Sequence, residues 1–266
     1  MTNMKMREII KRIIPNFILN AFRDLRDRIA HQGKYDYKMK RDRDSSLDYT
    51  TRYDHKSIRK ARKSILWDDD WQGATLATIN ILNQLKLLEG VGTIVDYGGG
   101  IGRISRALLA NFQGRVILVD RSTEMRDHAR SYIPKKMADD DRIEIWSDTE
   151  FMREMAEIEE GVDLILFIEA LQHIPEPILD KIFPKFVSFL SPEGQIFVLG
   201  NKDLDVDLQA RRHHTLIGDF LRKHVEVLRE DIWTEWERGG ETFRFKHPRF
   251  SFLCRKRMSP DETRSM

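Results

Sequence analysis

Cysteine and long hydrophobic runs are nearly absent from this 266-residue sequence, and both absences exclude classes of protein. The one cysteine, Cys254, cannot form an intramolecular disulfide or a cysteine-based zinc site, so we expect a reducing compartment, the cytoplasm. No apolar run reaches the roughly 18 residues that a membrane-spanning helix needs. Hydrophobic residues still make up 41% of the chain, which is enough for a packed core.

Charge is unevenly distributed along the chain. Residues 1–63 hold 18 Lys and Arg against 8 Asp and Glu, so a basic arm precedes a mildly acidic body. Within residues 6–30 the apolar positions recur at helical spacing, and Pro15 marks a break or bend. We expect this helix to bury its apolar face against the rest of the chain, against a second copy of the chain, or at the inner face of an anionic membrane. Composition thus predicts a basic amphipathic helix with a polar connector at 1–63, a folded domain at 64–257 and a disordered tail at 258–266.

The folded domain alternates short β-branched runs with helical stretches, the pattern of a parallel sheet covered on both faces. Two further strands, joined by a turn at 238–240, predict a C-terminal antiparallel hairpin. The predicted strands are 93–97, 115–119, 142–146, 162–168, 194–199, 224–233 and 243–256. The fold class is therefore α/β, a Rossmann-like, doubly wound, mostly parallel sheet of seven strands.

A glycine-rich turn follows the first of these strands. Asp96 ends the strand, and Gly98, Gly100 and Gly102 alternate before a helix begins. Alternate glycines allow a tight turn and let a ligand lie against bare backbone. A nicotinamide fingerprint places its third glycine three residues after the second, which this turn does not. A carboxylate at Asp96 also suits a ligand with an ammonium group better than a pyrophosphate.

This turn resembles motif I of the class I S-adenosylmethionine-dependent methyltransferases. Three later segments match that superfamily in order: residues 116–120, 143–148 and 162–174. The segment from Leu171 through His173 to Ile174, and the later 190–195, are close to its small-molecule branch. The resemblance covers residues 71–255 and implies S-adenosylmethionine as cofactor.

The resemblance assigns parts of the cofactor to parts of the chain. It implies that the glycine turn and Asp96 hold the methionine portion, Asp120 the ribose and Asp148 the adenine. Phe167 to Glu169 would line the floor below the sulfonium. The full predicted cofactor set is Asp96, Tyr97, Gly98, Gly99, Gly100, Gly102, Arg103, Asp120, Arg121, Met125, Asp148, Thr149, Phe167, Ile168 and Glu169.

The methyl acceptor is less well defined. The chain lacks the Asn/Asp-Pro-Pro-Tyr/Phe motif of enzymes that methylate amino groups on nucleobases, which disfavours a nucleic acid. His173, His213 and His214 are candidate bases, since imidazole titrates near neutral pH. Arg211 and Arg212 could grip an anionic acceptor. No further spaced ligands accompany the histidine pair, so we expect no metal site.

The sequence therefore predicts methyl transfer to a small-molecule, lipid-linked or glycan acceptor, most favourably to an oxygen. The alternatives are N-methylation of a small molecule or protein, and a non-catalytic scaffold that only binds the cofactor. A nicotinamide-dependent oxidoreductase is the reading that the glycine spacing disfavours. Simpler roles also remain open for single residues: Asp120 as a helix cap, Asp148 as a surface acid, and 211–214 as a solvated helix face.

Overall fold

The computed structural model describes residues 71–257, except for 139–140, 158–160, 175, 202–207 and 239. The predicted basic helix at 6–30, the polar connector and the tail at 258–266 lie outside the described residues. The proposed domain limits therefore stay a prediction. Among the described helices, none is long and apolar enough to cross a membrane.

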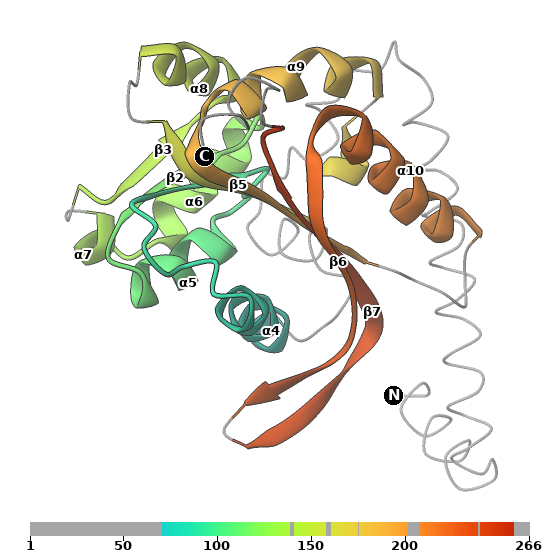
Figure 1. The fold of residues 1–266 in the computed structure, drawn as a ribbon. Coiled ribbons are helices and arrows are strands. Elements are labelled where there is room, and N and C mark those ends of the chain that lie inside the picture. The colour runs from blue at the N-terminus through green and yellow to red at the C-terminus, as the bar shows by residue number, and fades with distance from the viewer. Residues whose placement is uncertain are drawn as a thin grey trace, which may run out of the picture. The chain divides into compact units, whose positions relative to one another are not determined.

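Helices and strands alternate along the described chain, as the sequence pattern predicts (Figure 1). The strands are β1 (Thr93–Tyr97), β2 (Arg115–Val119), β3 (Ile143–Trp146), β4 (Val162–Ile168), β5 (Leu190–Asn201), β6 (Glu226–Arg238) and β7 (Glu241–Arg255). The helices are α4 (Trp71–Gln84), α5 (Arg103–Asn111), α6 (Thr123–Tyr132), α7 (Lys135–Ala138), α8 (Asp148–Glu154), α9 (Glu176–Ser188) and α10 (Leu208–His224). Two short 3₁₀ turns, η2 (Met155–Glu157) and η3 (Leu171–His173), complete the set.

The strands form one seven-stranded sheet in the order β3-β2-β1-β4-β5-β7-β6. Strands β1 to β5 pair in parallel, and β7 runs antiparallel to both β5 and β6. This confirms the predicted fold class. The strand order reverses between β1 and β4, and ligands of open α/β sheets bind beyond the carboxyl ends of the strands at such a point.

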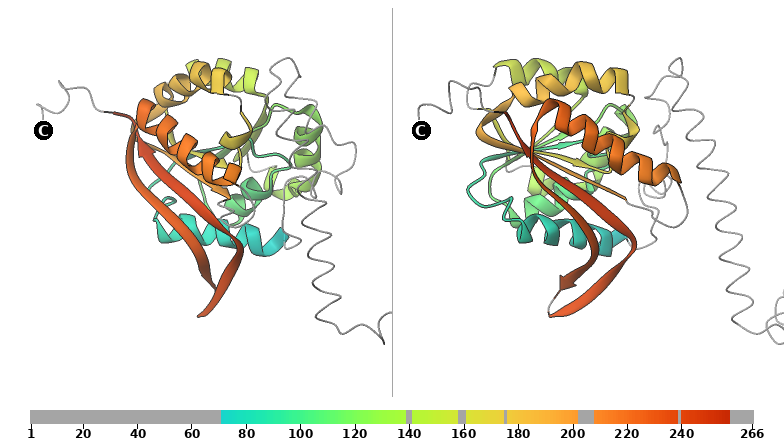
Figure 2. Two further views of the ribbon diagram at one scale, coloured as in Figure 1. Left: turned by 90° about the vertical axis from the view of Figure 1, so that its right-hand side faces the viewer. Right: turned by 45° about the vertical axis from the view of Figure 1, so that its right-hand side comes forward.

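Side-chain alternation along the strands divides the core into two layers. Ile165 and Phe167 of β4 face one layer, while Leu164 and Leu166 face the other. The first layer includes side chains of α8, α9 and α10, and the second those of α4, α5 and α6. Figure 2 shows α9 and α10 on one side of the sheet and α4 on the opposite side. Both faces of the parallel strands are thus buried, which explains their nearly continuous apolar sequences.

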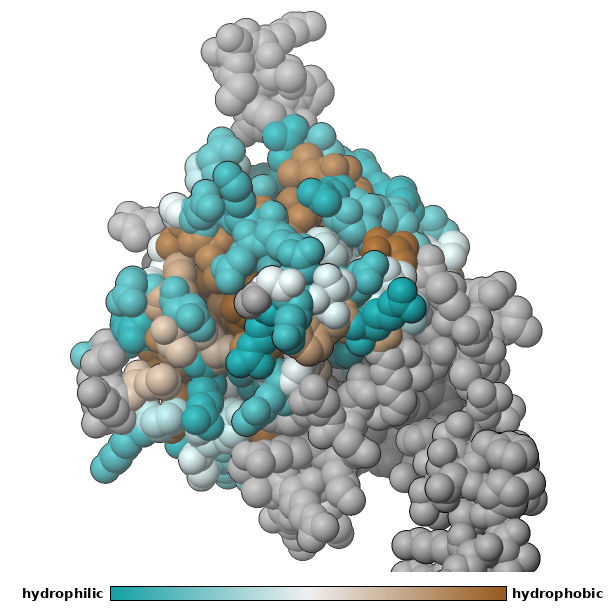
Figure 3. All heavy atoms as spheres, turned by 90° about the horizontal axis from the view of Figure 1, so that it is seen from below, coloured by the Kyte–Doolittle hydropathy of each residue, from teal (hydrophilic) through white to brown (hydrophobic). Residues whose placement is uncertain are grey.

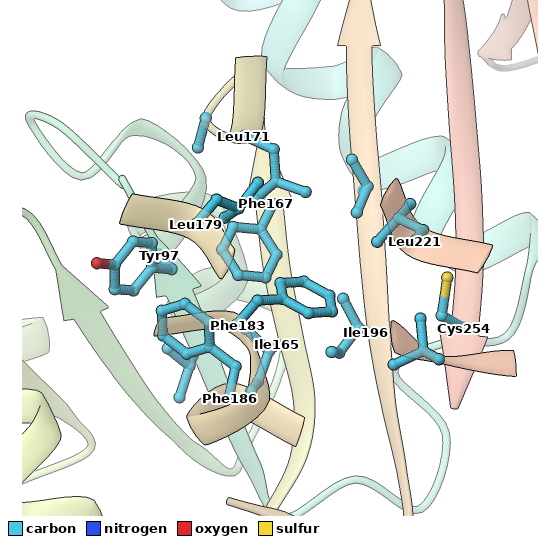
Figure 4. Close-up of a cluster of buried hydrophobic side chains, with 14 of the residues drawn as sticks. Tyr97, Ile165, Phe167, Leu171, Leu179, Phe183, Phe186, Ile196, Leu221 and Cys254 are labelled. Atoms are coloured by element: carbon cyan, nitrogen blue, oxygen red, sulfur yellow. The ribbon is translucent and has the colours of Figure 1, made fainter. Parts of the chain in front are cut away.

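Aromatic rings fill the first layer beneath α9 (Figure 4). The ring of Phe186 lies 4.6 Å from that of Tyr97 and 5.3 Å from that of Phe167, centroid to centroid, both edge-on. Phe151 and Phe183 add further tilted or edge-on contacts. Because such pairs stabilise beyond the area they bury, this cluster fixes α9 and the end of β1 together.

The structure adds two features that the apolar pattern did not indicate. Helix α8 begins at a capping box, in which Ser147 and Glu150 bond each other's backbone N–H groups. The hairpin of β6 and β7 is longer than predicted, and its far end extends beyond the rest of the sheet (Figure 1). Its outer part, residues 234–244, is rich in charge, so it did not resemble a buried strand.

The surface seen from below is mainly hydrophilic, with separate hydrophobic groups between the polar ones (Figure 3). Few large apolar side chains are exposed in the described part of the chain. They are Leu76, Leu216, Leu228, Ile232 and Phe243.

Replacing Phe186 by alanine should destabilise the fold by about 3–5 kcal/mol, because the fully buried ring leaves a cavity among four others. The matched control is Phe243→Ala, whose ring is 37% exposed and should cost under about 1 kcal/mol. Chemical denaturation followed by fluorescence measures both. Equal losses in the two variants would contradict this description of the core.

Candidate functional site

The glycine turn lies at the carboxyl end of β1, at the point where the strand order reverses. Gly98, Gly100 and Gly102 have φ angles of 74°, 57° and 77°, in the left-handed region that favours glycine. The N–H groups of Gly98 and Gly99 both donate to the carbonyl of Val119, at 2.8 and 3.1 Å. These bonds hold the turn against the end of β2.

The turn also packs closely against the segment that follows β4. A Cβ atom added at Gly98 would lie 2.7 Å from the Cβ of Ala170, closer than real Cβ contacts. One added at Gly102 would lie 2.9 Å from a methyl group of Leu118. Glycine therefore suits these positions for two reasons: the backbone is left-handed, and neighbouring elements approach it closely.

Asp96 is buried beneath the first turn of α5. Its Oδ2 accepts hydrogen bonds from the hydroxyl of Ser105 at 2.6 Å and from the N–H of Ser105 at 3.1 Å. Burial raises the pKa of this carboxyl, and the bonds from Ser105 together with the charge of Arg103 oppose that rise. One oxygen thus fastens β1 to α5, so a role toward a ligand's ammonium group, as predicted, would fall to the other oxygen.

Asp120, at the end of β2, joins the glycine turn to α6. Its Oδ2 accepts from the N–H of Gly100 at 2.8 Å and its Oδ1 from the N–H of Ser122 at 2.9 Å. Burial raises the pKa of Asp120 to about 6, against the opposing effect of these two bonds. Ser122 itself caps α6 through its side chain, so Asp120 is not the side chain that caps this helix. Each carboxylate oxygen can still accept a further bond, the capacity that two ribose hydroxyls require.

Asp148, Arg121 and Tyr97 lie beside Asp120. The Nε of Arg121 is 3.7 Å from Oδ2 of Asp148, and both side chains are partly exposed. Burial, followed by the charges of Asp148 and Asp120, raises the pKa of the Tyr97 phenol. Figure 4 shows the Tyr97 hydroxyl directed away from the aromatic cluster. The ends of β1, β2 and β3 thus bring these predicted residues into one neighbourhood.

The remaining predicted cofactor residues differ in exposure. Phe167 is fully buried, with its ring inside the aromatic cluster, and Met125 is 1% exposed in α6. Ile168 is 9% exposed. Thr149 follows Asp148 in the first turn of α8 and donates its N–H to Oδ1 of Asp148 at 3.0 Å. Phe167 and Met125 therefore support the site from the core.

Arg103 begins α5 directly after the glycine turn and is 7% exposed. Its Nη1 donates to the hydroxyl of Thr75 at 3.1 Å. Burial and, to a smaller extent, the nearby charge of Arg249 lower its pKa to about 10, while the charges of Glu169 and Asp96 oppose the change. The predicted role of Arg103 in binding the cofactor stays a prediction.

Glu169 follows β4 in a left-handed conformation, with φ of 58°. Its Oε2 accepts from the side-chain amide of Gln172 at 3.0 Å, and its Oε1 pairs with the guanidinium of Arg249 in β7. Arg249 is a residue that the sequence analysis missed. No local pattern could indicate it, because 80 positions separate it from Glu169 and only the hairpin's return beside β5 brings them together.

The predicted histidines lie in two places. His173 ends the 3₁₀ turn η3 and is partly buried, and its N–H donates to the carbonyl of Ala170 at 3.0 Å. His214 lies in α10, with its Nε2 2.9 Å from Glu230 and its ring stacked on that of Phe252. These contacts give His214 a packing role, and its role as a base stays a prediction. Arg211, Arg212 and His213 belong to α10, but their side chains lie outside the described residues.

These residues fit S-adenosylmethionine, because a bare left-handed turn adjoins three carboxylates at the ends of neighbouring strands. The turn can accept a ligand against its backbone, Asp120 can accept hydroxyl hydrogens, and Asp148 can accept from an amino group. This combination of exposed backbone and acceptor carboxylates suits a nucleoside that is joined to an amino acid.

Comparison with known proteins agrees with this geometry. A family model described as a methyltransferase domain matches residues 94–194. A search of curated proteins found no match. Among solved structures, an S-adenosylmethionine-dependent methyltransferase from Aquifex aeolicus has a TM-score of 0.53 at 18% identity, covering 75% of this chain and 98% of its own.

Two further structures share the fold. Magnesium protoporphyrin IX methyltransferase from Synechocystis PCC 6803, solved with bound S-adenosylmethionine, has a TM-score of 0.51 at 16% identity and covers 80% of this chain and 100% of its own. Mitomycin 7-O-methyltransferase has a TM-score of 0.51 at 18% identity and covers 80% of this chain and 62% of its own. Residues 94–194 thus match a methyltransferase domain with S-adenosylmethionine as its cofactor, and the glycine turn and the strand order are consistent with the class I superfamily.

Proposed function

We propose that this methyltransferase acts on a small-molecule acceptor and transfers the methyl group to an oxygen atom. The observation that carries the proposal is the segment after β4, where Glu169, Ala170, Leu171 and Gln172 stand in place of an Asn/Asp-Pro-Pro-Tyr/Phe motif. Glu169 and Gln172 bond each other there, so this segment is not arranged to bind a base's amino group. Mitomycin 7-O-methyltransferase, which shares the fold, is named for an oxygen acceptor on a small molecule, and this supports the proposal.

When bound, S-adenosylmethionine supplies an electrophilic methyl group on a positively charged sulfur. The chain's own residues then act mainly by alignment, since methyl transfer gains most from holding two reactants in line. The glycine turn would exclude water from one side of the bound cofactor, and Asp120 would fix the ribose. A hydroxyl acceptor also loses a proton, and His173, two residues beyond Leu171 in η3, is the base that we propose.

The proposal places the enzyme in the cytoplasm, because a single cysteine suits a reducing compartment. Residues 6–30 lie outside the described part. Their apolar face would bind the enzyme either to a membrane or to a second copy of the chain. A lipid-linked or glycan acceptor would suit a membrane surface, and a second copy of the chain would give a dimer.

Substituting Gly98 by alanine should weaken S-adenosylhomocysteine binding by about tenfold or more. The new Cβ would lie 2.7 Å from Ala170 and push the turn away from the segment after β4. The matched control is Gly90→Ala, since Gly90 has a similar φ of 71° but no atom within 4 Å. Isothermal titration calorimetry measures both variants. Similar losses of affinity would mean that backbone strain, and not the close approach, accounts for the effect.

Cofactor affinity should decrease as the pH is lowered through 6, by up to about tenfold per pH unit. The pKa of Asp120 is raised to about 6, and only its ionised form accepts bonds from both ribose hydroxyls. The stability of the unliganded fold depends on pH in the opposite direction to the cofactor affinity. Because the folded pKa lies above the usual aspartate value of 3.8, the contribution of Asp120 to the stability of the fold is full below that pH and is lost as the pH rises through 6.

Calorimetric titration of S-adenosylhomocysteine between pH 5 and pH 8 tests this dependence. Asp120→Asn is the control: its affinity should be lower at pH 8, and its profile should be flat. If the variant kept the wild-type pH profile, another group would be responsible.

The acceptor class is tested with S-adenosylmethionine that carries a deuterated methyl group and a panel of small phenols, alcohols, carboxylic acids and amines. Mass spectrometry then identifies the methylated product and its atom. We expect labelled ethers or esters, and His173→Ala should lower kcat while S-adenosylhomocysteine affinity stays within about twofold. Label found only on amines would contradict the proposal.

A further inference from the structure

An ion pair connects the cofactor side of the sheet with the C-terminal hairpin. The carboxylate of Glu169, after β4, pairs with the guanidinium of Arg249 in β7. Its other oxygen accepts from Gln172 in η3, so two separate elements determine where the carboxylate lies. The side chains of Arg249 and Glu169 are only 11% and 13% exposed. Charges with so little water around them act more strongly on their neighbours than surface charges do.

This pair lies directly beside the glycine turn. Ala170, the residue after Glu169, is the one that Gly98 approaches so closely. Arg249 is opposite Asn201, the last residue of β5, and thus at the carboxyl edge of the sheet. A Cβ at Gly200 would lie 2.4 Å from the ring of Phe250 and 2.9 Å from Oε1 of Gln172, so the surroundings of the pair are tightly packed.

A second guanidinium shares this environment. The pKa of Arg103 is lowered first by burial and then by the charge of Arg249, while Glu169 raises it. Arg103 therefore lies within the field of both members of the pair. Without Glu169, the charge of Arg249 would act on Arg103 without this opposing carboxylate.

We propose that Arg249 is a positioning residue, which balances the charge of the Glu169 carboxylate beside the glycine turn and so limits how strongly this carboxylate attracts the charged methyl donor. The Glu169 carboxylate then favours the charged donor over the neutral product, and the Arg249 guanidinium reduces this preference. The donor carries a positive sulfonium and S-adenosylhomocysteine a neutral thioether, while the rest of the two molecules is the same. A nearby carboxylate therefore attracts only the donor, and a nearby guanidinium repels only the donor. This inference rests on the methyltransferase assignment.

The measurement is the ratio of two dissociation constants, that of S-adenosylhomocysteine divided by that of S-adenosylmethionine, by calorimetry without acceptor. Glu169→Gln keeps the size and polarity of the side chain but removes its charge, and should lower the ratio by about three- to tenfold. Arg249→Met removes the opposing charge and should raise the ratio by a similar factor. The double variant should return to within about twofold of the wild-type ratio, because the pair is neutral with or without both charges.

The same strand supplies matched controls. Arg255 pairs with Glu226 at 2.9 Å, but these side chains are 45% and 44% exposed, and Arg255 lies opposite Gln195 in the middle of β5. Six residues of β7 separate Arg249 from Arg255, about 20 Å along the strand. Arg255→Met and Glu226→Gln should therefore leave the ratio unchanged. Arg249→Lys keeps the charge and should also keep the ratio, even where its stability is lower.

Two results would overturn the inference while the methyltransferase assignment stands. One is an unchanged ratio in Glu169→Gln and Arg249→Met with a lower unfolding temperature in both, which would make the pair purely structural. The other is a shift of the ratio in the same direction in both variants. If Arg249→Met does not fold, Glu169→Gln and Arg249→Lys still decide, since only the first should change the ratio. A wild-type protein that binds neither ligand would refute the assignment itself.

Discussion

The close approach of Gly98 to Ala170 is the constraint around which the cofactor side of this protein is organised. It requires a residue without a side chain at the end of β1, and it brings the segment after β4 under the turn. The carbonyl of Val119 and the carboxylate of Asp120 then hold the turn against β2. Three neighbouring strand ends are thereby connected through backbone groups and one acid, so the turn has a fixed shape before any ligand binds.

The buried carboxylates add a cost that the fold must offset. Burial raises the pKa of both Asp96 and Asp120, which means that the surroundings disfavour their charged forms. Hydrogen bonds donated by Ser105, Gly100 and Ser122 offset part of the cost of burying these charges. Charged groups in such places cost stability and are retained where a ligand uses them, which agrees with the position of Asp120 beside the glycine turn.

The sequence was sufficient for those features that depend on local pattern. Alternating apolar runs predicted the sheet and its hairpin, and the spacing of Gly98, Gly100 and Gly102 predicted the turn and, by resemblance, its cofactor. The capping box from Ser147 to Glu150 was also present in the sequence and could have predicted α8. The pairing of Glu169 with Arg249 could not be predicted, because it depends on the register of β7 on β5. For the same reason, Asp96 could not be assigned its bond to Ser105 before the packing of α5 was known.

Among the described strands, β6 lies at the edge of the sheet, where a strand from another molecule could add. Charged side chains occur along most of this strand, among them Arg229, Asp231, Glu235 and Glu237. Two register shifts between β6 and β7 also make the edge strand irregular. Such charges and irregularities disfavour strand addition, because an added strand would have to desolvate the charged side chains and pair with an irregular edge. The described domain can therefore expose Leu228 and Ile232 on its edge strand β6 and still resist edge-to-edge aggregation.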